Sequence, residues 1–275
     1  MIKDIVVNLG LGAQDPAGAY AISVAEKFEA HLVGIAVSYE PVIPGTVMGG
    51  VPPDVIEGQR VESNKRANAA IARFEQAAKR AGISMESRLI TTSVAGAADQ
   101  IGRIARRFDL AIVGQPGRKP SLPDQVVDEG VLFESGRPVI FVPYIQTGGV
   151  NLDRIMVCWD GSRTASRAVA DAMPFLKKAK QVEIVIVSNK PAKADELPGV
   201  DLGQHLARHG LKVDIKRITS PDNDVPSTIL SHAADSSADM IVMGGYGHSR
   251  LREFVLGGAT RGLLESMTVP VLMSH

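Results

Sequence analysis

The chain lacks the features that mark disulfide-stabilised, membrane-spanning and nucleic-acid-binding proteins. Its one cysteine, Cys158, cannot form a disulfide within the chain. No apolar run approaches the roughly 20 residues that a membrane helix needs. The 30 basic and 30 acidic residues cancel, so no excess charge attracts nucleic acid or an anionic membrane. Aromatic residues make up only 4% of the chain, which removes the stacking platforms that bind single-stranded nucleic acids.

The first residues also lack the pattern of a secretory leader. Lys3 and Asp4 follow only two residues after the start, and no apolar region of sufficient length comes next. The composition, 45% hydrophobic and 22% charged, is ordinary for α/β proteins. These observations predict a soluble cytoplasmic protein, and 275 residues are enough for two compact domains.

The sequence does contain an internal repeat. Three pairs of segments match in the same order: Ile5–Asn8 with Ile155–Cys158, Asp109–Gly117 with Asp239–Gly247, and Arg137–Ile140 with Val269–Leu272. The offsets are 150, 130 and 132 residues, so the first copy carries about twenty extra residues before its second landmark. We expect them in the Pro/Gly-rich stretch 39–58, as a loop or flap. The repeat predicts two domains, 1–147 and 151–275.

Each copy alternates short apolar runs with helical patterns, which is typical of βαβ units and a parallel sheet. The expected strands are 2–8, 30–38, 84–91, 109–114 and 138–142, then 153–159, 182–188, 211–218, 239–243 and 269–273. The expected helices are 14–29, 60–81, 95–107 and 122–135, then one capped by Ser162 and kinked or interrupted near Pro174, one at 200–209 ending at Gly210, one after Ser227, and a last one opened by Gly257. The predicted fold class is α/β, with two Rossmann-like, doubly wound, five-stranded parallel-sheet domains in tandem.

Ligands of open α/β sheets bind beyond the carboxyl ends of the strands, where the strand order reverses. In the second copy the first strand ends in Cys158-Trp159-Asp160-Gly161-Ser162 and the fourth in Met243-Gly244-Gly245-Tyr246-Gly247. Nine residues later, Gly257-Gly258-Ala259-Thr260 opens the last helix. Such glycines let backbone N–H groups approach an anion, and a helix N-terminus adds further donors. This pattern predicts a phosphate-binding edge, with Asp160 as an acceptor for a sugar or base.

The pattern resembles the ATP motif of universal stress proteins, which is G-x-x-G, nine residues and G-[ST]. Asp160-Gly161-Ser162 is similar to the opening signature of that family. The resemblance implies a tandem member that binds ATP together with Mg²⁺ in its second domain. It places these residues around the nucleotide: Cys158, Trp159, Asp160 and Val187 at the adenine, Met243 and Gly244 at the adenosine, and Tyr246, Gly247, Gly257, Gly258, Ala259 and Thr260 in the loop and helix start that hold the phosphates. Gly258 replaces the Ser or Thr of the motif, so one phosphate hydroxyl is lost while Thr260 keeps another.

The first copy departs from this pattern. Gly114-Gln115-Pro116-Gly117 keeps two glycines, but Val127 stands at the third position, followed by Asp128 and Glu129. Pro116 has no N–H to donate, and two carboxylates repel an anion. Its first strand ends in Asn8-Leu9-Gly10, without an aspartate of the family type. We therefore expect a degenerate site in the first copy and one nucleotide per chain.

Other candidate sites have less support. His205 and His209 are four residues apart on one helix face, a spacing that can bind a metal. However, no Glu follows His205 as in a zinc-protease helix, and no third ligand is in view, which favours solvated surface residues. Cys158 reads as a small strand-end residue rather than a redox nucleophile. The chain also has neither a G-x-S-x-G elbow nor a Walker A lysine.

The hypothesis is a nucleotide-responsive regulatory or protective protein of the stress response, without a dedicated enzyme activity. One alternative is slow ATP hydrolysis or self-phosphorylation on Ser162, Ser249 or Thr260, although no general base is evident. Another is a nucleotide-free scaffold that holds a small apolar ligand beneath the 39–58 loop. We expect the copies to pair as a pseudo-dimer through strands 138–142 and 269–273, because open strand edges invite uncontrolled pairing. Homodimerisation of whole chains stays open.

Overall fold

The computed structural model describes residues 1–41, 52–115, 122–188, 199–220, 224–245 and 258–275 of the 275-residue chain. Contacts divide the chain into two compact units. The N-terminal unit comprises Ile2–Ser135 and Thr147–Gly149, and the C-terminal unit comprises Gly136–Gln146 and Val150–His275. None of the helices in the described ranges is long and apolar enough to span a membrane.

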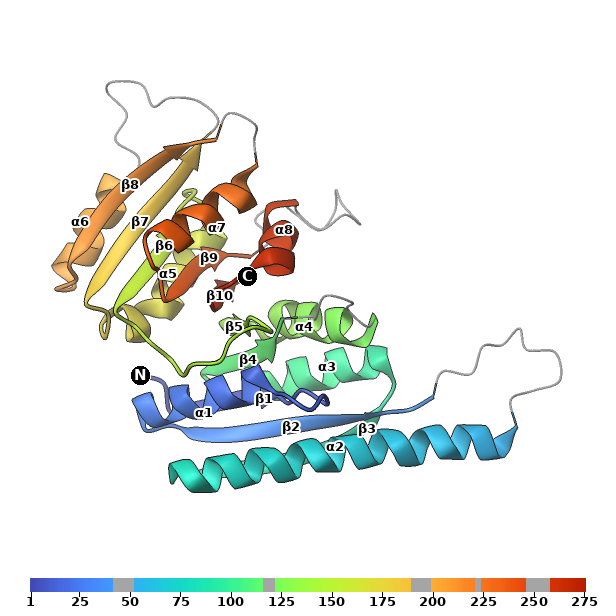
Figure 1. The fold of residues 1–275 in the computed structure, drawn as a ribbon. Helices are drawn as coiled ribbons and strands as arrows, with labels where there is room; N and C mark the ends of the chain where they lie inside the picture. The colour runs from blue at the N-terminus through green and yellow to red at the C-terminus, as the bar shows by residue number, and fades with distance from the viewer. Residues whose placement is uncertain (42–51, 116–121, 189–198, 221–223, 246–257) are drawn as a thin grey trace. The chain divides into compact units, whose positions relative to one another are not determined.

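The N-terminal unit is a parallel sheet with its connecting helices (Figure 1). Its strands, in the spatial order β3-β2-β1-β4, are β3 (Met85–Thr92), β2 (His31–Tyr39), β1 (Asp4–Asn8) and β4 (Leu110–Gly114). Its helices are α1 (Pro16–Phe28), α2 (Pro53–Ala81), α3 (Val94–Ala105) and α4 (Leu122–Ser135). Seven consecutive residues of β2, 32–38, are buried, as expected for a strand covered on both faces.

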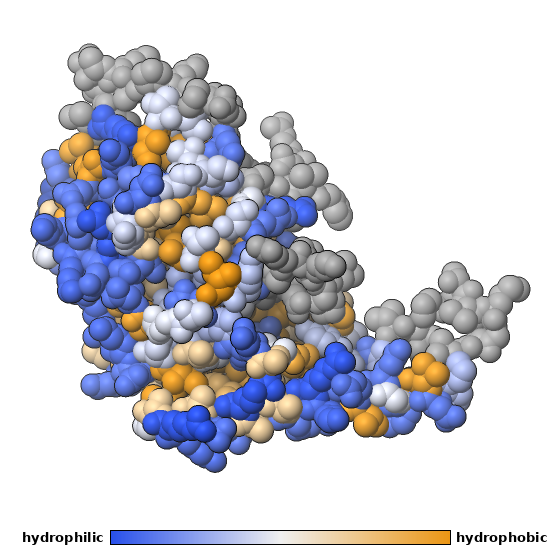
Figure 2. All heavy atoms as spheres, viewed as in Figure 1, coloured by the Kyte–Doolittle hydropathy of each residue, from blue (hydrophilic) through white to orange (hydrophobic). Residues whose placement is uncertain are grey.

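Helix α2 begins earlier than the sequence predicted. Its first residue is Pro53 rather than residue 60, because proline is favoured in the first helical turn, where its missing N–H costs nothing. The expected loop 39–58 is therefore shorter at its end, and residues 42–51 of it lie outside the described residues. The first turns of α2 are exposed to solvent. The relative accessible surface is 46% for Val55 and 59% for Val61. The visible face of this helix is mostly hydrophilic with isolated apolar side chains (Figure 2).

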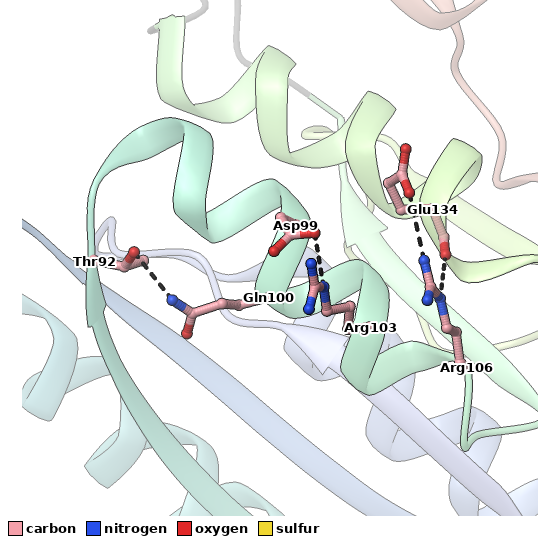
Figure 3. A network of polar contacts seen from close by, with 6 residues as sticks. All are labelled: Thr92, Asp99, Gln100, Arg103, Arg106 and Glu134. Atoms are coloured by element: carbon pink, nitrogen blue, oxygen red, sulfur yellow. Dashed lines mark hydrogen bonds and ion pairs between the residues drawn. The ribbon is translucent and has the colours of Figure 1, made fainter.

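Helices α3 and α4 pack closely because glycines lie at their contact. A Cβ added to Gly102 would come within 2.6 Å of Glu134 Cβ, and one added to Gly130 within 2.5 Å of Ala98 Cβ. At the end of α4, Arg106 donates from Nε to the backbone oxygen of Glu134 at 2.8 Å and pairs with its carboxylate at 3.4 Å (Figure 3). This arginine thereby caps the carboxyl end of α4.

The C-terminal unit holds the five strands of the second copy and one strand of the first. The parallel strands are β10 (Val271–Ser274), β9 (Met240–Gly244), β6 (Arg154–Cys158), β7 (Gln181–Ser188) and β8 (Val213–Thr219), in this spatial order. Strand β5 (Val139–Val142) pairs with β10 in the antiparallel direction, with Phe141 opposite Val271 and Val139 opposite Met273. The predicted strand 138–142 therefore forms, and by its contacts it groups with the C-terminal unit.

The helices of this unit are α5 (Arg163–Leu176), α6 (Val200–Arg208), α7 (Val225–Asp235) and α8 (Gly258–Ser266). The prediction that a helix follows Ser227 was wrong by one turn: Asp224 is the N-cap and accepts from Ser227 N at 3.2 Å. The predicted interruption at Pro174 does not occur, since this proline lies in the last turn of α5 and the helix continues to Leu176. The doubly wound α/β class predicted from the sequence is confirmed.

Candidate functional site

The carboxyl ends of three adjacent strands meet at one edge of the C-terminal unit. Strand β6 lies between β7 and β9, with Cys158 opposite Val185 in the register. Trp159 follows β6 and donates its backbone N–H to Val185 O at 2.9 Å, which extends the pairing beyond the strand. Two residues further along β7 is Val187, which is half-buried, and near the end of β9 is Met243, which is buried. The structure thus brings the predicted adenine and adenosine residues to neighbouring strand ends.

A tight turn carries the chain from β6 into α5. Gly161 has φ +75°, a left-handed conformation that favours glycine. Asp160 Oδ1 accepts from Ser162 N at 2.9 Å, and Ser162 Oγ accepts from Ala165 N at 3.1 Å, which caps α5. The Asp160 residue is exposed. The Asp-Gly-Ser sequence therefore builds the turn itself and leaves a carboxylate at the solvent side of the strand end.

Gly244, the first glycine of the motif, allows a close approach between β9 and α5. A Cβ at this position would lie 2.5 Å from Ala165 N and 2.7 Å from Thr164 C, so no larger residue fits without movement of the backbone. The corresponding Gly114 of the first copy has more room, because the nearest atom to its Cβ would be Ala17 Cβ at 3.7 Å. Gly244 thus serves close packing between a strand and a helix, a role that glycines of the motif can have without a nucleotide.

The environment of the Cys158 thiol makes this group unreactive. Burial, together with the nearby Asp160 charge, raises the pKa of this thiol to about 12. The thiol is therefore protonated at neutral pH, and the thiolate that acts as nucleophile or metal ligand is scarce. This agrees with the prediction of a small strand-end residue rather than a redox centre.

The phosphate side of the predicted site is described in part. Thr260 lies in the first turn of α8, together with Gly258 and Ala259. It is buried, with 5% of its surface exposed. Tyr246, Gly247 and Gly257 lie outside the described residues. So does Ser249, one of the three residues considered for self-phosphorylation.

The matching edge of the N-terminal unit is built differently. Residues 9–14 connect β1 to the N-cap Asp15, whereas only 159–161 connect β6 to the N-cap Ser162. Arg73 of α2 donates to Gly12 O at 2.6 Å and holds this longer loop. Asp15 Oδ1 accepts from Gly18 N at 3.0 Å. Burial raises the pKa of the Asp15 carboxyl, against hydrogen bonds from Gly18 and Gly10 and the charge of Arg73, which lower it.

Sequence reasoning missed this arrangement, although the greater length of the loop 9–14 was a visible signal. The loop Pro116-Gly117 of the first copy lies outside the described residues. Val127, which stands at the third glycine position, is buried in α4. The strand-end edge of the first copy therefore has a half-buried carboxylate, Asp15, as the N-cap of α1, where Ser162 caps α5 in the second copy.

These features define a doubly wound α/β protein, and the ends of β6, β7 and β9 form its candidate ligand edge. Residues 151–275 match the family model described as the universal stress protein family. Universal stress protein Slr1230 of Synechocystis sp. is 21% identical over 217 residues, which cover 76% of this chain and 72% of that protein.

Solved structures agree over the full length. A universal stress protein from Archaeoglobus fulgidus covers 98% of this chain and 95% of its own, with 19% identity and a TM-score of 0.70. A putative universal stress protein from Pseudomonas aeruginosa covers 99% and 93%, with 15% identity and a TM-score of 0.63. Residues 151–275 therefore belong to the universal stress protein family, and the chain as a whole has the fold of solved universal stress proteins.

Proposed function

We propose that the chain is a nucleotide-responsive regulatory protein that binds one ATP in its C-terminal unit. The observation that carries the proposal is the convergence of Asp160, Val187 and Met243 at three adjacent strand ends, beside the glycine-bearing end of β9. Ligands of this sheet class bind at such an edge. The glycines at 244, 247 and 257 in the sequence supply the close backbone approach that phosphates require.

Each described residue has a role in this proposal that follows from its chemistry. Val187, Met243 and the protonated Cys158 offer a wall without charge for the adenine ring. Asp160 offers an exposed acceptor for a ribose hydroxyl or the base amino group. Thr260 offers a hydroxyl in the first turn of α8, where backbone donors favour a phosphate.

A Mg²⁺ ion would be held mainly by the phosphates and by water. The part of the chain that the structure describes contains no group of three His, Cys, Asp or Glu side chains that could hold a metal. Mg²⁺ retains several waters and commonly binds through substrate phosphates, so a dedicated protein cage is not required.

We propose binding rather than turnover. Asp160, the acidic side chain of the turn after β6, already accepts from Ser162 N and fixes that turn. Its other oxygen is the one that we assign to the ribose or the base, so this carboxylate does not lie beside the terminal phosphate as a general base. When ATP is incubated with the protein, the ratio of ATP to ADP should therefore stay constant.

Titration calorimetry of the full chain with ATP tests the proposal. We expect close to one site per chain. Asp160→Ala should weaken binding by about 1–3 kcal/mol, which is roughly 5- to 150-fold, because it removes a charged acceptor. Gly247→Val should weaken it further, since a branched side chain blocks backbone approach to the phosphates.

The matched control is Gly117→Val, the same substitution at the corresponding glycine of the first copy. It should leave ATP affinity unchanged, because the first copy has the buried Val127 where the motif of the second copy has Gly257. Two equivalent sites would contradict a single nucleotide per chain, and loss of binding through Gly117 instead of Gly247 would show that the nucleotide binds in the N-terminal unit. Thermal unfolding of each variant separates loss of binding from loss of fold.

A further inference from the structure

Helix α6 carries two histidines on its solvent side. Its buried residues, Leu202, Gly203 and Leu206, face the sheet, where Gly203 comes close to Ile215 of β8. His205 and His209 are exposed. The predicted surface position of both histidines is therefore correct, and the contact between their rings shows that they lie on the same side of the helix.

The two imidazole rings lie close to the separation that a shared metal ion imposes. Their centroids are 4.8 Å apart with an interplanar angle of 69°. An imidazole nitrogen binds Zn²⁺ at about 2.0–2.1 Å, and the ring centre lies about 1.2 Å behind it, so two imidazoles at 90–110° around one ion have centroids about 4.5–5.2 Å apart. The observed distance falls within this interval, so rotation of the side chains is enough to bind without movement of the helix.

The backbone supports this geometry. His209 is the C-cap of α6, with φ −84° and ψ 6°, and its N–H donates to Leu206 O at 3.0 Å, so the last turn is tighter than an α-helical turn. The two rings nevertheless remain neighbours across this turn, with centroids 4.8 Å apart. The carboxyl end of a helix also favours a cation, through the negative end of its dipole. Arg208 and Lys212 are nearby in sequence and exposed, and their charge opposes this effect.

We propose that His205 and His209 form a surface chelate for one divalent transition-metal cation that prefers imidazole, with water completing its coordination. Such ions are Cu²⁺, Ni²⁺ and Zn²⁺, and affinity should follow the order in which Cu²⁺ binds most tightly. The site lies on α6 and uses none of the residues of the proposed nucleotide edge, so either proposal can fail without the other.

Calorimetry of the full-length chain with CuCl₂ or ZnCl₂ alone, in a non-coordinating buffer without nucleotide, tests the chelate. We expect one site per chain that loses at least tenfold in affinity in His205→Ala and in His209→Ala. The double variant should lose binding at this site completely, because each single variant still keeps one ring as a weak monodentate ligand. Both residues are exposed, so the melting temperature without metal should stay within a few degrees of the parent value.

Two controls distinguish the chelate from general histidine content. Ala207→His combined with His209→Ala keeps the number of histidines but moves one ring two positions from His205, where side chains do not face each other. This variant should bind as weakly as His209→Ala, and His31→Ala should bind as tightly as the parent. Equal affinity in the parent and in the spacing control, or loss of binding in His31→Ala, would overturn the assignment.

Discussion

Glu183, which is buried, and His232, which is half-buried, form a polar contact where the first copy has apolar residues. Glu183 Oε2 and His232 Nε2 are 3.0 Å apart, with side-chain exposures of 11% and 16%. By the repeat offset of 150, Glu183 of β7 corresponds to Val33 of β2. Aligning the caps Asp224 and Ser93 matches His232 with Ile101. Val33 and Ile101 are both buried, so the same position between strand and helix holds an apolar pair in the first copy and a polar pair in the second.

The pair should behave as one unit in a double-mutant cycle. Glu183→Val or His232→Ile alone leaves a largely buried polar group without its partner and should cost about 1–3 kcal/mol of unfolding free energy. The double variant has the apolar pair found in the first copy. Its free energy of unfolding should equal or exceed that of the parent. Urea unfolding measures all four proteins. Strictly additive losses would show that the two side chains do not depend on each other.

Asp15 gives a pH-dependent prediction. Burial raises the pKa of its carboxyl, so the folded chain holds this proton more tightly than the unfolded chain does. The contribution to stability is therefore complete below the ordinary pKa of an aspartate and is lost as pH rises through the higher folded value. Asp15→Asn keeps a capping oxygen for Gly18 N without the buried charge.

We expect Asp15→Asn to be more stable than the parent at neutral pH, with the difference shrinking as the solution is acidified. Denaturant unfolding at a series of pH values measures it. A variant that is less stable at neutral pH, by an amount that does not vary with pH, would show that Arg73 and the cap hydrogen bonds outweigh burial.

Among the helices, the contact between α3 and α4 depends most directly on small residues. Gly130→Val would place carbon atoms where Ala98 Cβ already lies within 2.5 Å of the first added atom. Overpacking of this kind typically costs about 1–3 kcal/mol, and the shift would also disturb the Arg106 cap on Glu134. Thermal and urea unfolding should show the loss.

Gly58→Ala is the matched control in α2. A Cβ at Gly58 meets no atom within 4 Å. Alanine is favoured over glycine in a helix by about 1 kcal/mol, so this substitution should be neutral or raise helix content measured by circular dichroism. A destabilising Gly58→Ala together with a neutral Gly130→Val would contradict the packing described for both helices.

The strands and most helices were predictable because apolar runs and caps are local signals. Ser162 and Gly210 marked helix ends correctly, since capping chemistry is read from neighbouring residues. The predicted start of helix α2 was too late, because the first fourteen residues of this helix contain no buried side chain. These residues therefore show no periodic apolar face in the sequence. The Arg73 contact to Gly12 was not predictable, because it joins residues 61 positions apart.

At the scale of the whole molecule, β5 matters most, because it is the last strand of the first copy and pairs with β10, the last strand of the second. A fragment 151–275, cut at the predicted domain boundary, lacks β5 and exposes the edge of β10. Open strand edges pair with other chains. We expect this fragment to self-associate in sedimentation experiments, whereas fragment 136–275, which retains β5, should associate less. Equal behaviour of the two fragments would show that β5 does not protect that edge.

The antiparallel pairing of β5 with β10 has a consequence for a chain that has been cut. The connection between β5 and β6 can be nicked around residue 148 without breaking a strand, because β5 ends at Val142 and β6 begins at Arg154. The severed first piece would still carry β5, hydrogen-bonded into the sheet of the second piece. The two pieces should therefore stay together after proteolysis, and should reassemble as a split protein when they are co-expressed from separate genes.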